Sequence, residues 1–130
     1  ACRGRGPAAF VATAHWLRAA FADLEFEIRD AVADGELVVV HATMSGRQTG
    51  PFVAYDVRGE VAQAFPSKGR TFSITQTHWF RIRDGLVGEH WANRDDLGMA
   101  TQLGWVPPTP LFLWRMARAT RHARRNPVEV

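Results

Sequence analysis

The pair Asp84-Gly85 separates two stretches of the chain whose side chains alternate between apolar and polar. The first stretch covers residues 70–83, and the second covers residues 86–95. Asp-Gly between two alternating stretches is the strongest short-range signal of a β-hairpin with a two-residue turn. The sequence therefore predicts a long antiparallel hairpin, and any fold of this chain has to accommodate it.

The remaining patterns place helices and strands in separate groups. Apolar residues at helical spacing predict a helix over residues 8–22, and alternation predicts strands over 24–32 and 37–45 joined by a turn. Residues 46–69 are irregular, with a candidate strand at 61–65. Short and long helices are expected at 96–103 and 110–125. Segregated helices and strands indicate an α+β domain in which a curved antiparallel sheet wraps round helices, forming a cone with one interior pocket.

Composition limits the class of protein. The 130 residues make a single domain, 1–130, and no apolar stretch approaches the roughly 20 residues that cross a bilayer. Cys2 is the only cysteine, which excludes an internal disulfide and favours a cytoplasmic location. The histidines show no repeated ligand spacing, so no metal is expected. The excess of positive charge lies in the predicted basic helix 110–125, which we interpret as a solvated face and not as a nucleic-acid or membrane site.

The second strand of the hairpin contains the most unusual polar pattern. A strand alternates its side chains, so Glu89, Trp91, Asn93 and Asp95 are expected on one face and His90 on the other. Polar groups beside an indole suit the wall of a pocket better than a plain core. A carboxyl group in such a pocket acts as a general acid or base, and Asp95 is the candidate. Asp96 is expected to cap the following helix.

The first strand of the hairpin supplies candidates on its apolar face. Gln76 and His78 interrupt an otherwise apolar stripe that includes Phe72 and Phe80. Such a histidine is either a paired core residue or a pocket residue, and we expect His78 to face the same cavity as Asp95. The predicted site therefore has two catalytic residues and a substrate-binding set: Asp95 and His78, with Gln76, Trp91, Asn93, His41, Phe72 and Phe80.

Several motifs together resemble the SnoaL-like polyketide cyclases, or ester cyclases. They run in order from Ala20-Phe21-Ala22-Asp23-Leu24 to Gln102-Leu103-Gly104, and they cover about residues 17–104. Between them lie Asp34 to Val40, Gly46-Arg47-Gln48-Thr49-Gly50 with Phe52, Pro66 to Arg70, Phe80 to Gly85, and Glu89-His90-Trp91 with Asp95. The chain departs from the family pattern at Gln48, where His is common, and at His41, where Arg is common. The family's first helical segment is also expected to be absent.

The resemblance implies a fold of the nuclear-transport-factor-2-like type, commonly dimeric through the sheet. It also implies a cyclase that closes a ring of a hydrophobic, carbonyl-bearing compound by intramolecular aldol condensation without cofactor or metal. Asp95 would be its acid/base and His78 would assist the enolate. Two alternatives stay open: a non-catalytic small-molecule-binding module, and an enzyme like ketosteroid isomerase or epoxide hydrolase. An epoxide hydrolase needs an Asp-Arg-Asp relay, which Arg94-Asp95-Asp96 does not supply because neighbouring strand residues face opposite sides.

Overall fold

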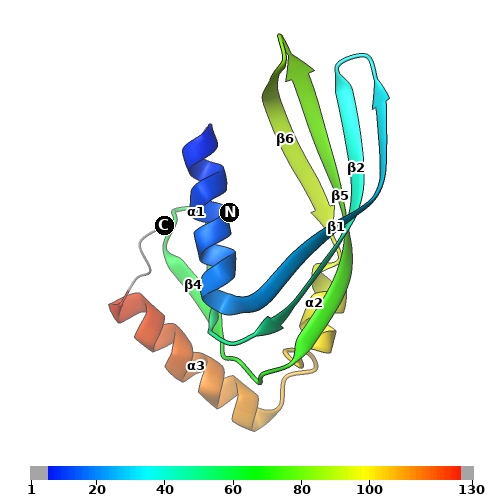
Figure 1. The fold of residues 1–130 in the computed structure, drawn as a ribbon. Helices are drawn as coiled ribbons and strands as arrows, with labels where there is room; N and C mark the ends of the chain where they lie inside the picture. Colours follow the sequence, from blue (N-terminus) through cyan, green and yellow to red (C-terminus); the bar gives the residue numbers. More distant parts are fainter. Residues whose placement is uncertain (1–5, 127–130) are drawn as a thin grey trace.

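The computed structural model describes residues 6–126, which form three helices and six strands within that range (Figure 1). Cys2 lies outside the described residues. In chain order the elements are α1 (Pro7–Ala20), β1 (Phe21–Asp34), β2 (Leu37–Gln48), β3 (Phe52–Tyr55), β4 (Val61–Phe65), β5 (Thr71–Arg83), β6 (Leu86–Arg94), α2 (Asp96–Gln102) and α3 (Pro110–Arg125).

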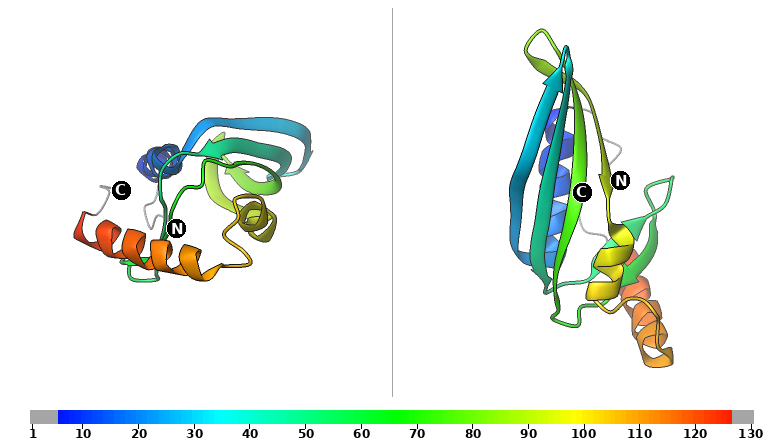
Figure 2. Two further views of the ribbon diagram at one scale, coloured as in Figure 1. Left: turned by 90° about the horizontal axis from the view of Figure 1, so that it is seen from below. Right: turned by 90° about the vertical axis from the view of Figure 1, so that its right-hand side faces the viewer.

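Four long strands form one antiparallel sheet in the order β1-β2-β5-β6. The predicted hairpin is present: Arg83 pairs with Leu86, and both turn residues, Asp84 and Gly85, have positive φ. Positive φ at both central positions defines a type I′ turn, whose twist matches that of the strands. Seen from below, the sheet is strongly curled and α1 lies at its open side (Figure 2). The predicted α+β class with a curved antiparallel sheet is confirmed.

The pairing register places the side chains of each strand alternately on an inner face and an outer face of the sheet. The inner face carries alternate residues of β5, and each is paired with an apolar or small residue of β2: Phe72, Ile74, Gln76, His78 and Phe80, opposite Gly46, Met44, Ala42, Val40 and Val38. The outer face carries the residues between them, including Thr77 and Trp79 opposite His41 and Val39. We use these two names for the two faces throughout.

The hydrophobic core covers only the lower half of the inner face. Phe21, Met44 and Phe72 are nearly inaccessible there, and they pack with Leu17 of α1 and Met99 of α2. On the same face the side chains of the edge strand β1 are open to solvent: Phe26, opposite Met44, is 50% exposed, and Ile28, opposite Ala42, is 67% exposed. Burial of apolar area therefore stabilises the base of the cone and leaves its upper inner surface available for contact.

Strands β3 and β4 form a separate two-stranded sheet, and α3 covers the free edge of β4. Thr120 Oγ1 accepts a hydrogen bond from the Ala64 N–H at 2.8 Å, and Arg124 donates to the Val61 carbonyl at 3.0 Å. These side chains satisfy strand groups that would otherwise be an exposed edge. Among the apolar side chains of α3, Met116 packs against the core, whereas Trp114 is 59% exposed.

Candidate active site

A chain of hydrogen bonds joins three polar side chains on the inner face. The His78 Nε2 lies 2.8 Å from the Gln76 Oε1, and the His78 Nδ1 lies 3.0 Å from the His90 Nε2. Gln76 is 3% exposed, His78 is half-buried and His90 is exposed. The cluster therefore runs from the buried floor of the sheet to its accessible surface.

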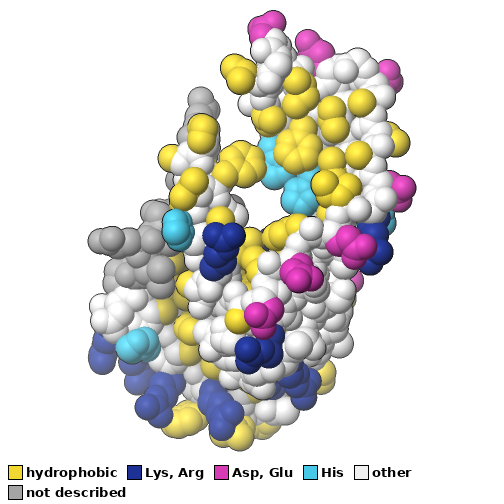
Figure 3. All heavy atoms as spheres, viewed as in Figure 1, with side chains coloured by type: hydrophobic (Ala, Val, Ile, Leu, Met, Phe, Trp, Pro, Cys, Tyr) yellow, Lys and Arg dark blue, Asp and Glu magenta, His cyan; other side chains and the backbone are white. Residues whose placement is uncertain are grey.

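Aromatic rings surround the outer end of this cluster. The His90 ring stacks on Phe80 with centroids 4.7 Å apart, and on the His78 ring at 5.3 Å. Phe10 of α1 reaches across to His90 at 5.4 Å, so α1 bridges to β6 above the core. The space-filling view shows hydrophobic side chains over the upper part of the sheet with histidines along their lower border, and a hollow beside α1 (Figure 3). This surface suits an apolar ring compound whose polar group reaches an imidazole.

The two imidazoles are held in the neutral form. Burial lowers the pKa of His78, and the neighbouring charges of His90 and Arg94 lower that pKa further. Burial alone lowers the pKa of His90. Arg94 belongs to the inner face because it pairs with Gln76, whereas β2 contributes the apolar Val40 opposite His78. Neutral imidazole is the basic form, so the cluster can accept a proton near neutral pH.

This depression of both pKa values predicts a pH-dependent stability. Below pH 6.5, the ordinary pKa of histidine, His78 and His90 bind protons more readily in the unfolded chain than in the folded chain. The free energy of unfolding therefore falls as the pH drops through 6.5. Urea midpoints measured one unit above and one unit below 6.5 should differ less in the double variant His78→Phe, His90→Phe than in the parent. An equal pH dependence in both proteins would contradict the prediction.

The structure places Asp95 at the N-terminus of α2 and not in the histidine cluster. Its carboxylate accepts a hydrogen bond from the Gly98 N–H at 2.8 Å, which makes Asp95 the N-cap of α2. Asp96, which was expected to cap, forms an ion pair with Arg94 at 3.2 Å. The expected division of roles between these two residues is therefore wrong. The Asp95 side chain is exposed, and its backbone N–H donates to the Thr75 carbonyl.

The expectation that Trp91 and Asn93 share a face with His78 is also wrong. Trp91 pairs with Trp79 and Asn93 pairs with Thr77, so both lie on the outer face. The reason is an irregularity at Gly88: Ile82 pairs with Val87 but Arg81 pairs with Glu89, which leaves Gly88 as an extra residue. One extra residue moves every later side chain of β6 to the opposite face.

The remaining predicted binding residues divide between the two faces. His41 is exposed on the outer face, opposite Thr77. Phe80 lies on the inner face against His90, as the apolar stripe indicates. Phe72 lies on the inner face too, but it is 3% exposed and packs on Phe21 in the core. Of the six predicted binding residues, only Gln76 and Phe80 contact His78 or His90 among the interactions described.

His90 and Phe10 are the site residues that the sequence did not indicate. His90 was assigned to the face away from the pocket because β6 was read without an irregularity, although a glycine within a strand is itself a sign of a bulge. Nothing in the sequence pairs Phe10 with the end of the hairpin. Among residues 6–126, no group of three histidine, cysteine or acidic side chains could hold a metal ion.

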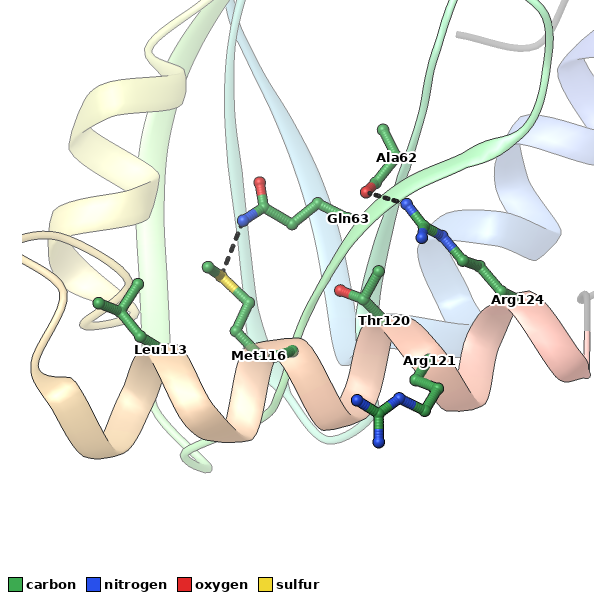
Figure 4. Close-up of a pocket in the computed structure, with 8 residues that line it drawn as sticks. Ala62, Gln63, Leu113, Met116, Thr120, Arg121 and Arg124 are labelled. Carbon is green, nitrogen blue, oxygen red and sulfur yellow. Dashed lines mark hydrogen bonds between the residues drawn. The ribbon is translucent and has the colours of Figure 1, made fainter.

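Two open grooves lie away from the cone. One, of about 410 Å³, runs between β4 and α3, where Gln63 donates to the Met116 sulfur at 3.1 Å and Arg124 donates to the Ala62 carbonyl (Figure 4). Another lies beside it around Tyr55 and Glu60. The inner surface of the cone is open above the core, where Ile28 is 67% exposed.

Comparison with known proteins identifies the family. The family model of the SnoaL-like polyketide cyclases matches residues 2–103. The chain belongs to this family. It is 36% identical over 107 residues to the aklanonic acid methyl ester cyclase DnrD of Streptomyces peucetius, covering 82% of this chain and 67% of that protein. The cyclase DauD of Streptomyces sp. strain C5 has the same identity over 82% of this chain and 60% of its own length.

A solved structure agrees with this assignment. TsrD from Streptomyces laurentii is 35% identical with a TM-score of 0.64, covering 78% of this chain and 68% of TsrD. The resemblance predicted from the motifs is therefore confirmed, as is the cone-like fold of the nuclear-transport-factor-2 type. The chain spans about two thirds or less of the two cyclases that it matches. No helix within residues 6–126 is both long and apolar enough to cross a membrane.

Proposed function

We propose that this protein is a cofactor-independent polyketide cyclase that closes a ring of a hydrophobic, carbonyl-bearing compound by intramolecular aldol chemistry. The family membership supports the reaction class. The observation that carries the proposal is the hydrogen-bonded imidazole pair of His78 and His90 beside the rings of the inner face. Such a surface can hold a flat apolar substrate and accept a proton α to its carbonyl group.

The acid/base role has two candidates in this proposal, Asp95 and the imidazole pair. The sequence predicts this role for Asp95, whose carboxylate is exposed and engaged in capping α2. Proton transfer by a positioned side chain contributes about 10²–10⁴-fold to a rate, so the two assignments predict very different variants.

The experiment compares two substitutions with aklanonic acid methyl ester, the compound named in the matched cyclases, as the substrate. Asn is as good an N-cap as Asp, so Asp95→Asn should keep the fold, and it should lower turnover only if Asp95 is the acid/base. His78→Phe, which preserves a ring in the stack, should lower turnover by at least about 10²-fold. Loss of turnover in Asp95→Asn alone would return the acid/base role to Asp95. Binding without any cyclised product in the parent protein would favour the binding module.

The same proposal includes a homodimer formed through the outer face of the sheet. On that face the indole rings of Trp79 and Trp91 are nearly parallel, with an angle of 6° between their planes, and Trp91 is 41% exposed. Val32, 65% exposed, belongs to the same face through its pairing with Val39. Exposed indoles beside aliphatic side chains are typical of protein interfaces. A cytoplasmic location, expected from the sequence, completes the proposal.

Replacing one indole tests the dimer. Trp91→Arg should raise the dissociation constant at least about tenfold, because truncating a central tryptophan costs more than about 1.4 kcal/mol. Sedimentation equilibrium of the parent and the variant measures the change. Trp114→Arg is the matched control, since Trp114 is 59% exposed on α3 and should leave the dimer intact. Equal dissociation of both variants, or a monomeric parent, would argue against this interface.

A further inference from the structure

Three cationic side chains, Lys68, Arg70 and Arg115, gather at the base of the cone beside the start of α3. Gly104 shows how close two of them lie, because a Cβ at this glycine would stand 3.3 Å from the Lys68 Nζ and 2.7 Å from the Arg70 Nη1. The Lys68 ammonium lies 4.1 Å from the centre of the Phe112 ring. Arg115 follows Phe112 on α3, close enough for its charge to act on that ammonium.

The loop that carries Lys68 and Arg70 is held in place by the buried residue Gln48. The Gln48 carbonyl accepts from the Ser67 hydroxyl at 2.7 Å, and the Gln48 N–H donates to the Arg70 carbonyl at 2.9 Å. The tip of Lys68 is fixed as well, since its ammonium donates to the carbonyl of the buried Gly104. The cations are therefore brought together by the fold.

No carboxylate balances this charge within residues 6–126. The ion pairs described there are all formed by arginines of the four long strands, and none includes Lys68, Arg70 or Arg115. Helix α3 has no acidic residue. The space-filling view shows Lys and Arg side chains gathered along the lower part of the molecule, whereas the Asp and Glu side chains visible there lie higher (Figure 3).

Like charges that are held together repel, and the effect is felt by Lys68. Burial of its ammonium lowers the pKa of Lys68, and the charges of Arg70 and Arg115 lower that pKa further. An anion among the three cations would relieve the repulsion. Arginine and lysine are the side chains that bind phosphate groups, and a phosphate monoester carries about −1.5 to −2 charges at neutral pH.

We propose that Lys68, Arg70 and Arg115 form a binding site for a phosphate group. The ammonium uses one of its donors on Gly104 and keeps the others for a ligand, and the planar fork of an arginine matches two phosphate oxygens. The cluster is compact, so it fits a single phosphate group and not an extended polyanion. The site goes beyond the cyclase function, since none of the three cations contacts His78 or His90 among the interactions described.

The first test titrates inorganic phosphate into the protein near neutral pH by calorimetry, with the ionic strength held constant by sodium chloride. We expect a dissociation constant on the order of 1 mM, weakened about fivefold or more in Arg70→Gln and in Arg115→Gln. The matched control is Arg121→Gln, which removes the same charge from α3 at a residue of the groove beside β4 and should bind like the parent. An Arg121→Gln protein weakened as much as Arg115→Gln, or a parent that binds no phosphate, would overturn the proposal.

The second test follows the ammonium itself. Lys68 is the only lysine of the chain, so the side-chain signals of a protein labelled with carbon-13 lysine need no assignment. Phosphate should raise the pKa of Lys68 in the parent protein, and should raise it less in Arg70→Gln, because the bound dianion favours the charged amine. A Lys68 titration that phosphate does not move would contradict the site, whereas a structural role of Lys68 alone predicts no response to phosphate.

The phosphate group can belong to a soluble compound or to a lipid headgroup, and vesicles distinguish the two sources. The probe is cosedimentation with phosphatidylcholine vesicles that contain phosphatidic acid, compared with phosphatidylcholine alone. Binding that needs both phosphatidic acid and Arg70 would assign the phosphate to a lipid. A protein that binds inorganic phosphate and stays in the supernatant would assign it to a soluble compound. Binding to phosphatidic acid that is unchanged in Arg70→Gln would count against the site.

Discussion

Gln48→Ala is expected to lower the free energy of unfolding by about 3–5 kcal/mol, because it combines a cavity with unsatisfied polar groups. Gln48 is completely inaccessible. Its Oε1 accepts from the Trp105 indole N–H at 3.1 Å, and its Nε2 donates to the carbonyls of Phe65 and Gly50 at 2.9 and 3.1 Å. The side chain thus ties the end of β2 to β4 and to the segment after α2. Urea denaturation should show a lower midpoint with an unchanged slope.

The matched control is Gln102→Ala. Gln102 makes two hydrogen bonds, with the N–H and the carbonyl of Ser73, but it is exposed and water can replace it. Its loss should cost about 1 kcal/mol or less. Equal losses for Gln48 and Gln102 would show that burial of the Gln48 network does not matter. Gln48 stands at a position where the family often has histidine, and the structure gives it a role in stability.

Most of the secondary structure could be predicted from local patterns. The helix at 110–125 and the strand at 61–65 have the predicted bounds, and the four long strands differ by only a few residues at their ends. Turn residues and alternation act over a few positions, so they can be read from sequence. Strand β3, Phe52–Tyr55, was missed because four residues give too little alternation to recognise. What holds β3 in place is its partner β4, which is a tertiary effect.

The site was predicted less well because its geometry depends on a single extra residue. A regular two-residue hairpin would place Trp91 opposite His78, and the pocket predicted from the sequence follows from that register. The irregularity at Gly88 moves Ala92 opposite His78 and His90 opposite Phe80. A register error of one residue exchanges the two faces of a strand completely. The chemical types were recognised, but their assignment to a face could not be.

Asp95 illustrates a second limit. Asp95 and Asp96 are adjacent, and either can accept a hydrogen bond from the first turn of α2. The choice depends on where β6 ends, and the strand ends at Arg94, which places Asp95 at the cap. Gly98 leaves room for the Asp95 carboxylate, because a Cβ at that position would meet its oxygens. The spacing of Asp95 and Gly98 was therefore a signal of capping.

Gly50→Ala is expected to be the most damaging single glycine substitution at the joint between α1 and the sheet. A Cβ on Gly50 would meet the Ala19 carbonyl oxygen well inside van der Waals contact, and both are backbone-anchored. The N–H groups of Thr49 and Gly50 donate to the Ala20 carbonyl at 2.9 and 3.1 Å, so the segment cannot move away without breaking these bonds. Overpacking of this kind costs about 1–3 kcal/mol, and more where backbone must shift.

The expected consequence reaches the site. Residues 46–50 carry part of the family resemblance, and here they fix the end of α1, the helix whose Phe10 contacts His90. Gly50→Ala should therefore lower both the unfolding midpoint and the turnover of aklanonic acid methyl ester. Gly88→Ala is the control: its Cβ would lie 3.6 Å from the nearest atom, the Arg81 carbonyl oxygen, so both measurements should stay close to the parent. A stable Gly50→Ala protein with full turnover would show that α1 needs no such joint, and that the family motif serves another purpose.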